Sequence, residues 1–329
     1  MRMIVVPRLG GPEVLTLAEV PQPAPKPDQV LIRLQYATLS YGDVYQREGT
    51  YRSGPMHPGE APLLIGGEGC GTVVSIGASV TDLKPGDRVV FGNHMGSYAE
   101  FAAVPARNVV RIPDGISFDD AAGVMGQGVT AHYLAYDTGK LASGMSCLVH
   151  AAAGGVGHCL VQLAKLRGAQ VIATVGSREK AAFVERLGAD RVVLYREEDF
   201  LDAVHAWCDG KGVDVVYDAV GPETLDRSIK ATRPRGLCVL YGNSSGLVES
   251  VAPMDLAAAG SIYFTRPRLA HHMRDRAEIV RRVDDLFGAI QAGKLKLHLN
   301  RIFPLAQAAD AHSLLQSRLT TGKILLSME

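Results

Sequence analysis

Residues 147–165 decide the fold: Cys147-Leu-Val-His-Ala-Ala-Ala-Gly-Gly-Val-Gly-His-Cys-Leu-Val-Gln-Leu-Ala-Lys165. The apolar run 147–149 is typical of a parallel strand that is buried on both faces. After a glycine-rich turn, Val156, Leu160 and Leu163 recur at the spacing of an amphipathic helix. The stretch therefore predicts a strand, a tight turn and a helix.

The turn carries a dinucleotide-binding fingerprint in which Ala152 replaces the first glycine. In such a fingerprint Gly154 lets the backbone approach a pyrophosphate, and Gly157 lets the helix pack closely on the strand. The amides at the start of the helix then face the anion. Because a degenerate fingerprint is weak by itself, an ordinary glycine-rich turn is the alternative.

The sequence around the turn favours the dinucleotide-binding interpretation. Further apolar runs follow, with helical patterns between them: 170–175, 214–218, 237–241 and 261–264. Alternation of strands and helices predicts a doubly wound, parallel sheet.

The segment after the second strand indicates which dinucleotide binds. An NAD site places Asp or Glu about 20 residues after the fingerprint, where it holds the ribose hydroxyls. This chain has Gly176-Ser177-Arg178-Glu179-Lys180, and we expect Glu179 to point into solvent. A hydroxyl and two cations suit a 2′-phosphate, so the segment predicts NADPH. The alternative is that Arg178 and Lys180 form a solvated first turn, although cations are disfavoured at a helix N-terminus.

Composition excludes several classes of protein. A chain of 329 residues is expected to form two domains. Its 34 basic and 34 acidic residues give no electrostatic case for nucleic acid or an anionic membrane. The five cysteines form no Cys-x-x-Cys pair, which disfavours a disulfide framework or a zinc knuckle. No apolar segment approaches the ~20 residues of a membrane span, and no signal peptide is expected at the start, so we expect a cytoplasmic protein.

The first part of the chain differs from the cofactor-binding part. Its short strands are separated by Pro and Gly, which indicates a compact β-rich domain: 30–36, 71–76 and 88–91. An amphipathic helix is expected at 274–292, and a closing strand after Thr320 is expected to return to the first domain. The expected domains are thus 1–123 with 267–329, and 124–266.

Short segments spread along nearly the whole chain resemble the medium-chain dehydrogenase/reductase superfamily, and within it the zinc-independent quinone oxidoreductases of the zeta-crystallin-like branch. They are specific only in combination: 10–15, 69–71, 85–89, 144–165, 195–199, 217–221, 242–246 and 265–267. The resemblance implies an α/β fold in which a GroES-like β-rich catalytic domain holds an inserted Rossmann doubly wound parallel sheet.

Two positions depart from the zinc-dependent members, which hold a catalytic zinc with a Cys and a His of the first domain. Here Ser40 stands at the Cys position and Gly67 at the His position, and the cysteine-rich lobe for a structural zinc is missing. No metal is expected, and alcohol oxidation is disfavoured without a Lewis acid. Many quinone oxidoreductases carry Asn where this chain has Ser40.

The resemblance also assigns roles to residues around a bound NADPH. The expected cofactor-binding residues are Ala153, Gly154, Gly155, Val156 and Gly157 at the pyrophosphate, Gly176, Ser177, Lys180 and Tyr195 at the 2′-phosphate and adenine, and Gly242, Asn243 and Ser244 over the nicotinamide half. Thr130 would reach the carboxamide, and Ser40 would lie near the nicotinamide end.

Two aromatic residues of the first domain, Tyr45 and Tyr51, would line the acceptor pocket. A tyrosine can stack on a quinone ring or donate a hydrogen bond to its oxygen, and the alternative is a core or surface filler. His271 and His272 suggest a metal site, but adjacent residues do not face each other on a helix, so a solvated helix start is expected.

The predicted activity is hydride transfer from NADPH to a small-molecule quinone, and an enone, alkenal or enoyl-thioester is the alternative acceptor. A structural or RNA-binding role, as in lens crystallins of the family, is disfavoured by the neutral charge. The apolar segment Gly260–Thr265 is expected to be an edge strand whose pairing with its copy gives a homodimer. Coverage of that edge by the 274–292 helix is the alternative.

Overall fold

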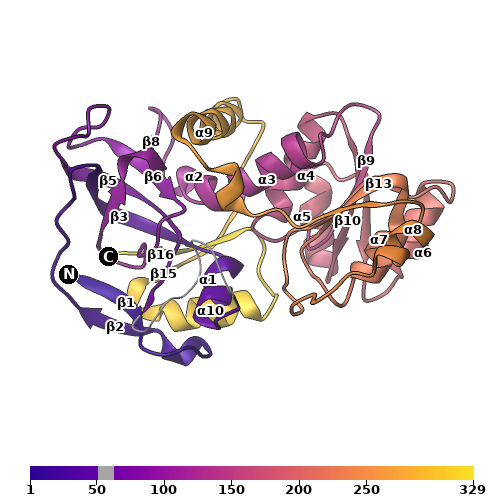
Figure 1. Cartoon of the computed structure of the whole chain (residues 1–329), viewed down its shortest axis with the longest axis horizontal. Coiled ribbons are helices and arrows are strands. Elements are labelled where there is room, and N and C mark those ends of the chain that lie inside the picture. The colour runs from indigo at the N-terminus through magenta and orange to yellow at the C-terminus, as the bar shows by residue number, and fades with distance from the viewer. Residues whose placement is uncertain (51–62) are drawn as a thin grey trace. The chain divides into compact units, whose positions relative to one another are not determined.

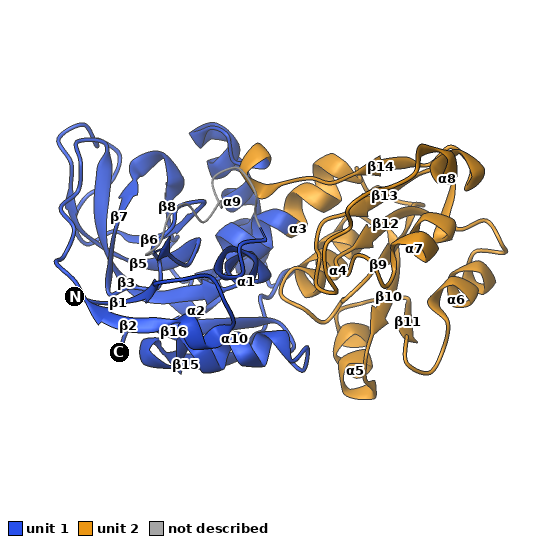
Figure 2. Ribbon diagram, turned by 60° about the horizontal axis from the view of Figure 1, so that its bottom comes forward, with its two compact units in different colours: residues 1–130, 272–329 blue, residues 131–271 orange. Residues whose placement is uncertain are grey.

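The computed structural model describes residues 1–50 and 63–329, which form two compact units (Figure 2). Unit 1 comprises Met1–Thr130 and His272–Glu329, and unit 2 comprises Ala131–His271. Tyr51 lies outside the described residues. The domain limits drawn from the sequence, at 124 and 266, lie a few residues from these divisions and stay a prediction.

Unit 2 is built on a six-stranded sheet in the order β11-β10-β9-β12-β13-β14, with every neighbouring pair parallel. Its strands are β9 Ser146–Val149, β10 Gln170–Val175, β11 Arg191–Leu194, β12 Val213–Asp218, β13 Thr232–Leu240 and β14 Tyr263–Thr265. Numbered from β9, this is the order 3-2-1-4-5-6 of the Rossmann fold. The predicted doubly wound sheet is confirmed, and β11 is a strand that the sequence analysis missed.

Helices connect these strands and cover the sheet (Figure 1). They are α4 Gly157–Leu166, α5 Arg178–Arg186, α6 Phe200–Trp207, α7 Leu225–Ala231 and α8 Pro253–Ala258, with short turns η4 Leu134–Thr138 and η5 Leu269–His272. Leu148, Ile172 and Val216 of the central strands pack with Phe200 and Ile229 of the helices in one buried cluster. Burial on both faces explains why these strands are continuous apolar runs.

In the described residues of unit 1 there are two sheets, one of which has seven strands in the order β15-β16-β3-β5-β6-β8 with β7 paired to β3. A smaller sheet has the order β2-β1-β4. The strands are β1 Arg2–Val6, β2 Thr16–Glu19, β3 Gln29–Leu39, β4 Leu63–Leu64, β5 Glu68–Ile76, β6 Arg88–Gly92, β7 Phe101–Pro105, β8 Val109–Arg111, β15 Leu299–Pro304 and β16 Lys323–Ser327. The pairing of β16 with β3 places the closing strand in the same sheet as the first part of the chain.

Helices and turns complete unit 1, with α3 crossing the division between the units. They are η1 Pro12–Val14, α1 Tyr41–Arg47, η2 Ala106–Asn108, α2 Phe118–Ala121, η3 Val124–Gly128, α3 Val129–Tyr133, α9 Arg276–Gln291, η6 Leu305–Gln307 and α10 Ala308–Gln316. The expected amphipathic helix is α9, whose residues Ile279, Val283 and Leu286 are buried. It ends before Gly293, which has a φ of +66° that a glycine adopts readily.

The sheet of unit 2 ends at β14, as expected for an edge strand. Tyr263 of β14 has 65% of its surface exposed. The preceding residue, Ile262, is buried and donates its amide to the carbonyl of Leu256 (3.0 Å), so its backbone donor is already used within the chain. Whether β14 pairs with a second copy stays a prediction.

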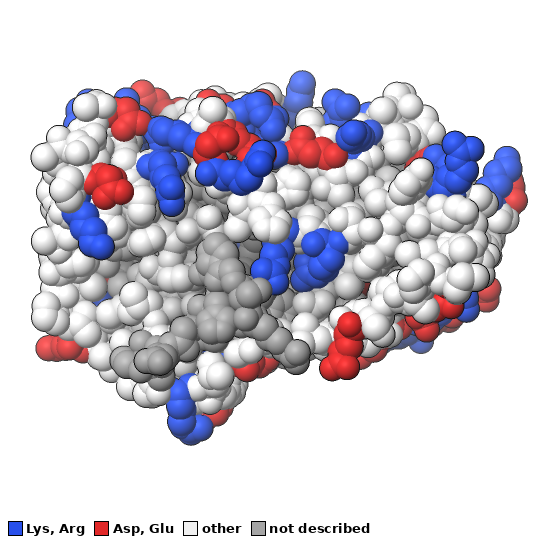
Figure 3. Space-filling model, viewed as in Figure 1, with Lys and Arg blue, Asp and Glu red and all other residues white. Residues whose placement is uncertain are grey.

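Charged side chains are mixed on the molecular surface. On the face drawn in Figure 3, many basic side chains lie next to acidic ones. The exposed ion pairs of the structure include Arg191 with Glu198 (2.7 Å) and Arg227 with Asp199 (2.8 Å). Across residues 1–50 and 63–329, no helix has the length and apolar character that crossing a membrane requires.

Candidate functional site

The phosphate turn of unit 2 connects β9 to α4 and is tightly constrained. Ala151 begins it with a φ of +50°, and its carbonyl accepts the amide of Gly154 (2.9 Å). A Cβ on Gly157 would lie 2.8 Å from the Cα of Ala152 and would also meet the Ala151 carbonyl. Only glycine fits there without moving the backbone, which agrees with the close packing that the fingerprint predicts. Ala153 is buried, and Gly154, Gly155 and Val156 are partly exposed.

The carboxyl end of β10 carries the residues expected at the 2′-phosphate. Val175 ends the strand, and the exposed Ser177 caps α5 by accepting the amide of Lys180 (3.3 Å). A Cβ on Gly176 would come within 2.7 Å of the Tyr195 hydroxyl, so the tyrosine lies directly against Gly176. The structure thus brings together four of the predicted residues just beyond the ends of the neighbouring strands β10 and β11.

The two cations of this segment differ in their surroundings. Arg178 is highly exposed and pairs with Glu197 (2.9 Å). Lys180 is half-buried. Its pKa is lowered mainly by burial and also by the charge of Arg196, whereas the charge of Glu179 raises it. An anion beside Lys180 would relieve this unfavourable balance. Lys180 is therefore the better candidate to meet a phosphate.

Residues 242–244 follow β13 and are held by the loop after β12. The amide of Ser244 donates to the Ala219 carbonyl (3.2 Å), and a Cβ on Gly242 would lie 2.9 Å from the Ala219 Cα. The Asn243 amide oxygen, oriented by its hydrogen bonds, accepts from Arg266 (3.1 Å). The carboxyl ends of parallel strands thus gather all of the predicted unit 2 residues at one edge of the sheet, where such folds bind nucleotides.

Ser40 and Gly67, at the positions where zinc-dependent members carry their Cys and His ligands, lie in unit 1. Both form hydrogen bonds to Asp43. The partly exposed Ser40 donates both its amide (2.8 Å) and its hydroxyl (3.0 Å) to Asp43, and Gly67 donates its amide (3.2 Å). Zinc sites in proteins are made by Cys, His and carboxylate ligands, and neither Ser40 nor Gly67 supplies one. Among residues 1–50 and 63–329 no three His, Cys, Asp or Glu side chains are grouped as metal ligands.

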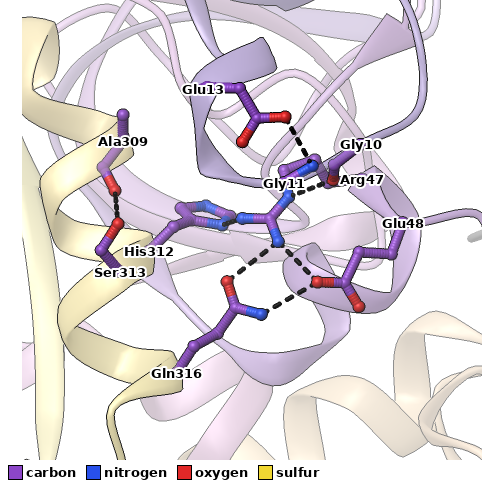
Figure 4. Close-up of polar contacts among 9 residues, drawn as sticks. All are labelled: Gly10, Gly11, Glu13, Arg47, Glu48, Ala309, His312, Ser313 and Gln316. Atoms are coloured by element: carbon purple, nitrogen blue, oxygen red, sulfur yellow. Dashed lines mark hydrogen bonds and ion pairs between the residues drawn. The ribbon is translucent and has the colours of Figure 1, made fainter.

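Asp43 is connected to a buried hydrogen-bonded network at the α1–α10 contact. Figure 4 shows Arg47 of α1 bonded to His312 (2.9 Å) and Gln316 (2.9 Å) of α10. Because arginine can only donate, Nδ1 of His312 accepts this hydrogen bond. Burial, and then the charge of Arg47, lower the pKa of His312 to about 3. Its other nitrogen then donates to the Tyr98 hydroxyl (3.1 Å), which donates to Asp43.

Burial lowers the pKa of His312 but raises the pKa of the two carboxyl groups nearest Ser40 and Gly67. It raises the pKa of Asp43 to about 6 and that of Glu68 to about 7. The amides of Gly126 and Met125 donate to Glu68, and the charge of Lys323 favours its ionised form. Sequence reasoning missed both acids. Ser40-x-x-Asp43 is a capping-box spacing that could have identified the first, whereas the contacts of Glu68 come from distant parts of the chain.

The remaining predicted residues have less defined surroundings. Thr130 is partly exposed in α3, and Tyr45 is buried in α1, where its ring lies 5.9 Å from that of Tyr41. Tyr45 therefore presents little surface for an acceptor. His271 lies in η5 and is exposed, and His272 is partly exposed, in keeping with a surface turn.

Comparisons with known proteins agree with this arrangement. A family model described as "Alcohol dehydrogenase GroES-like domain" matches residues 26–114, and one described as "Zinc-binding dehydrogenase" matches residues 155–283. The chain is 40% identical over 318 residues to a quinone oxidoreductase of Pseudomonas aeruginosa, covering 96% of each chain. It is 39% identical over 326 residues to a 2-haloacrylate reductase of a Burkholderia species, covering 98% of this chain and 97% of the relative.

A solved structure gives the same result. The Escherichia coli quinone oxidoreductase, determined in complex with NADPH, superposes with a TM-score of 0.96 at 36% identity, covering 99% of this chain and all of the other. The fold and its site thus define a medium-chain oxidoreductase. The chain belongs to the medium-chain dehydrogenase/reductase superfamily, in the branch that contains the quinone oxidoreductases.

Proposed function

We propose that this protein is an NADPH-dependent reductase that transfers a hydride to a quinone without a metal ion. The choice of NADPH over NADH rests on the segment that follows β10. Gly176, Ser177 and Lys180 stand there in place of the acid that an NAD site requires. The NADPH complex of the E. coli relative supports the same choice.

In this proposal the protein binds and orients the cofactor and the acceptor and keeps water away from them, and bound NADPH supplies the hydride. The constrained turn around Gly157 would hold the pyrophosphate, and Lys180 with Ser177 would select the 2′-phosphate. Residues 242–244 would close over the nicotinamide half. Ser40, fixed by Asp43, would present a hydroxyl rather than a metal ligand toward the acceptor. A quinone is electrophilic enough to need no Lewis acid.

An activated alkene is the second candidate acceptor. The 2-haloacrylate reductase that resembles this chain over nearly its full length is the observation that favours it. Alkenals, enones and enoyl-thioesters belong to the same chemical class, because each accepts a hydride at an electron-poor carbon. The same cofactor site serves both candidates.

The two candidates are separated by measuring NADPH oxidation with a panel of acceptors at matched concentrations. The panel contains 1,4-benzoquinone, 9,10-phenanthrenequinone, a 2-alkenal and a 2-haloacrylate. The proposal predicts kcat/KM values for the quinones at least tenfold above those for the alkenes, a difference of about 1.4 kcal/mol in transition-state stabilisation. The reverse ranking would assign the alkene reductase, and no oxidation with any acceptor would refute both candidates.

A further inference from the structure

A chain of buried polar side chains runs through unit 2 directly before the loops at the carboxyl ends of β9, β10 and β12. His150, which follows β9, lies 2.9 Å from the Thr174 hydroxyl and 3.1 Å from the Ser228 hydroxyl. Ser228 in turn donates to Asp218 (2.7 Å). All four side chains are at most 2% exposed.

The chemistry of the partners fixes the direction of every hydrogen bond. Ser228 uses its one proton toward the Asp218 carboxylate, so its oxygen accepts from Nε2–H of His150. Nδ1 of His150 is then the acceptor for the Thr174 hydroxyl. Burial lowers the pKa of His150, in keeping with a neutral ring. The chain therefore holds His150 in one tautomer and one orientation.

Asp218 is the last member of this hydrogen-bonded network, and both of its carboxylate oxygens accept hydrogen bonds. Besides Ser228, it accepts the amides of Val220 (2.7 Å) and Gly221 (3.0 Å) and the hydroxyl of Thr224 (2.7 Å). These donors shape the loop after β12. A buried carboxylate with this many donors is a rigid anchor for the groups that bond to it.

Two members of this network lie directly before loops that are predicted to bind the cofactor, and Asp218 ends β12. His150 immediately precedes the phosphate turn, and Thr174 lies two residues before Gly176. The backbone adds two links, from the Ala152 amide to the Thr174 carbonyl (3.2 Å) and from the Gly242 amide to the Asp218 carbonyl (3.3 Å). Three loops that are separate in sequence therefore share one buried support.

We propose that His150 is a positioning residue for the cofactor: it fixes the phosphate turn, the 2′-phosphate loop and the loop after β12 relative to one another through Thr174, Ser228 and Asp218. This inference rests on the proposed function, because it assumes that the phosphate turn and the 2′-phosphate loop bind NADPH. It assigns no chemical step to His150, whose ring is buried and whose two nitrogens are bonded to Thr174 and Ser228.

The matched control is a second Ser–Asp pair at the opposite end of β12. Ser146 of β9 donates its hydroxyl to Asp214 of β12 (3.1 Å), as Ser228 does to Asp218. Both pairs join a serine to an aspartate of β12, but only the Asp218 pair lies at the carboxyl end, where the loops are. Ser146→Ala and Ser228→Ala thus each remove a hydroxyl that donates to an aspartate of β12, at opposite ends of that strand.

The test is an equilibrium titration of NADPH by fluorescence with the wild-type full chain and four variants, each paired with a urea melt. Ser228→Ala and Thr174→Val should raise Kd by about tenfold, because each leaves a nitrogen of the buried imidazole without its partner. Thr174→Ser keeps the hydroxyl and should restore Kd to within about threefold of wild type. Ser146→Ala should lower stability while leaving Kd within about twofold.

The outcomes separate failure of the inference from failure of the function. A wild-type protein that binds no NADPH refutes the proposed function and the inference with it. Wild-type binding with unchanged Kd in Ser228→Ala and Thr174→Val overturns the inference alone. So does an equal loss of affinity in Ser146→Ala, since that would be a general effect of lost stability. If Thr174→Val does not fold, Ser228→Ala against Ser146→Ala decides the question.

Discussion

We propose that the half-buried cation of Lys180 selects NADPH over NADH. Burial and the neighbouring Arg196 make its charge unfavourable in the free protein, and a phosphate would remove that cost. We predict that Lys180→Ala weakens NADPH binding by about 1–3 kcal/mol, the range for a charge-assisted contact, and leaves NADH binding nearly unchanged. Calorimetric titration with both cofactors measures this difference directly.

Arg191 provides the control for that substitution. Arg191 forms an exposed pair with Glu198, so Arg191→Ala removes a cation of unit 2 without touching the segment after β10. Exposed pairs contribute little, and both cofactors should bind as they do to the wild-type protein. An equal loss for NADPH and NADH in Lys180→Ala would show that the lysine does not read the 2′-phosphate.

Glu68 makes the stability of the protein depend on pH. Burial raises its pKa from an ordinary 4.5 to about 7, so the folded state disfavours the ionised carboxylate. Its stabilising contribution is complete below about pH 4.5 and is lost as the pH rises through about 7. We predict that Glu68→Gln, measured by urea unfolding, gains on the order of 1–3 kcal/mol relative to wild type between pH 5 and pH 8.

Burial and the charged neighbours of Glu68 together determine whether Glu68→Gln is more or less stable than the wild type. Lys323 favours the ionised form, whereas Asp43 disfavours it, and burial is the largest of these effects. If Glu68→Gln instead loses stability relative to wild type as the pH rises, the attraction of Lys323 outweighs burial and the assignment is wrong.

At the scale of elements, two helical glycines are predicted to respond oppositely to alanine. A Cβ on Gly157 would press on the backbone of Ala151 and Ala152, so Gly157→Ala should shift the phosphate turn and weaken NADPH binding at least tenfold. Gly288 in α9 is exposed with no atom within 4 Å of such a Cβ, so Gly288→Ala should raise stability by about 0.5–1 kcal/mol.

Thermal unfolding and NADPH titration of both variants check this pair. The Gly288→Ala protein should bind NADPH like the wild type. A Gly157→Ala protein with unaltered affinity would mean that the turn can move aside, and that the tight packing of α4 on β9 is not what the cofactor requires.

The elements that could be predicted from the sequence are those whose pattern is local. The apolar run of β9, the glycine turn and the spacing of α4 each lie within a few residues, and five of the six parallel strands followed from repeating this pattern. β11 was missed because it is short and mostly half-exposed, without a strong apolar run.

The supporting contacts of the site could not be read in the same way. His150, Thr174 and Ser228 are brought together by strand order, and nothing in their spacing reveals it. The same holds for Arg47 with His312, which lie far apart in the sequence and meet where α1 contacts α10 (Figure 4). Single buried polar residues in apolar runs are ambiguous until their partners are known.

At the scale of the whole molecule, β14 remains an exposed edge with Tyr263 on its surface. We predict a homodimer in which this strand pairs with its copy, because an apolar edge strand is usually covered. Tyr263→Lys would place like charges near the two-fold axis and should shift light-scattering mass from dimer to monomer at micromolar concentration.

Leu319→Lys is the matched control for the dimer, since Leu319 is 73% exposed and belongs to unit 1. It should leave the mass unchanged. A wild-type protein that is monomeric across micromolar concentrations would contradict the predicted assembly, without bearing on the cofactor.

The central claim is that NADPH alone, with no metal ion, reduces a quinone on this protein. The most direct measurement is the rate of NADPH oxidation by 1,4-benzoquinone before and after exhaustive chelation, with NADH run in parallel. We predict an unchanged rate after chelation and a kcat/KM for NADPH at least tenfold above that for NADH. Loss of activity on chelation with recovery on added zinc, or equal rates with both cofactors, would contradict the claim.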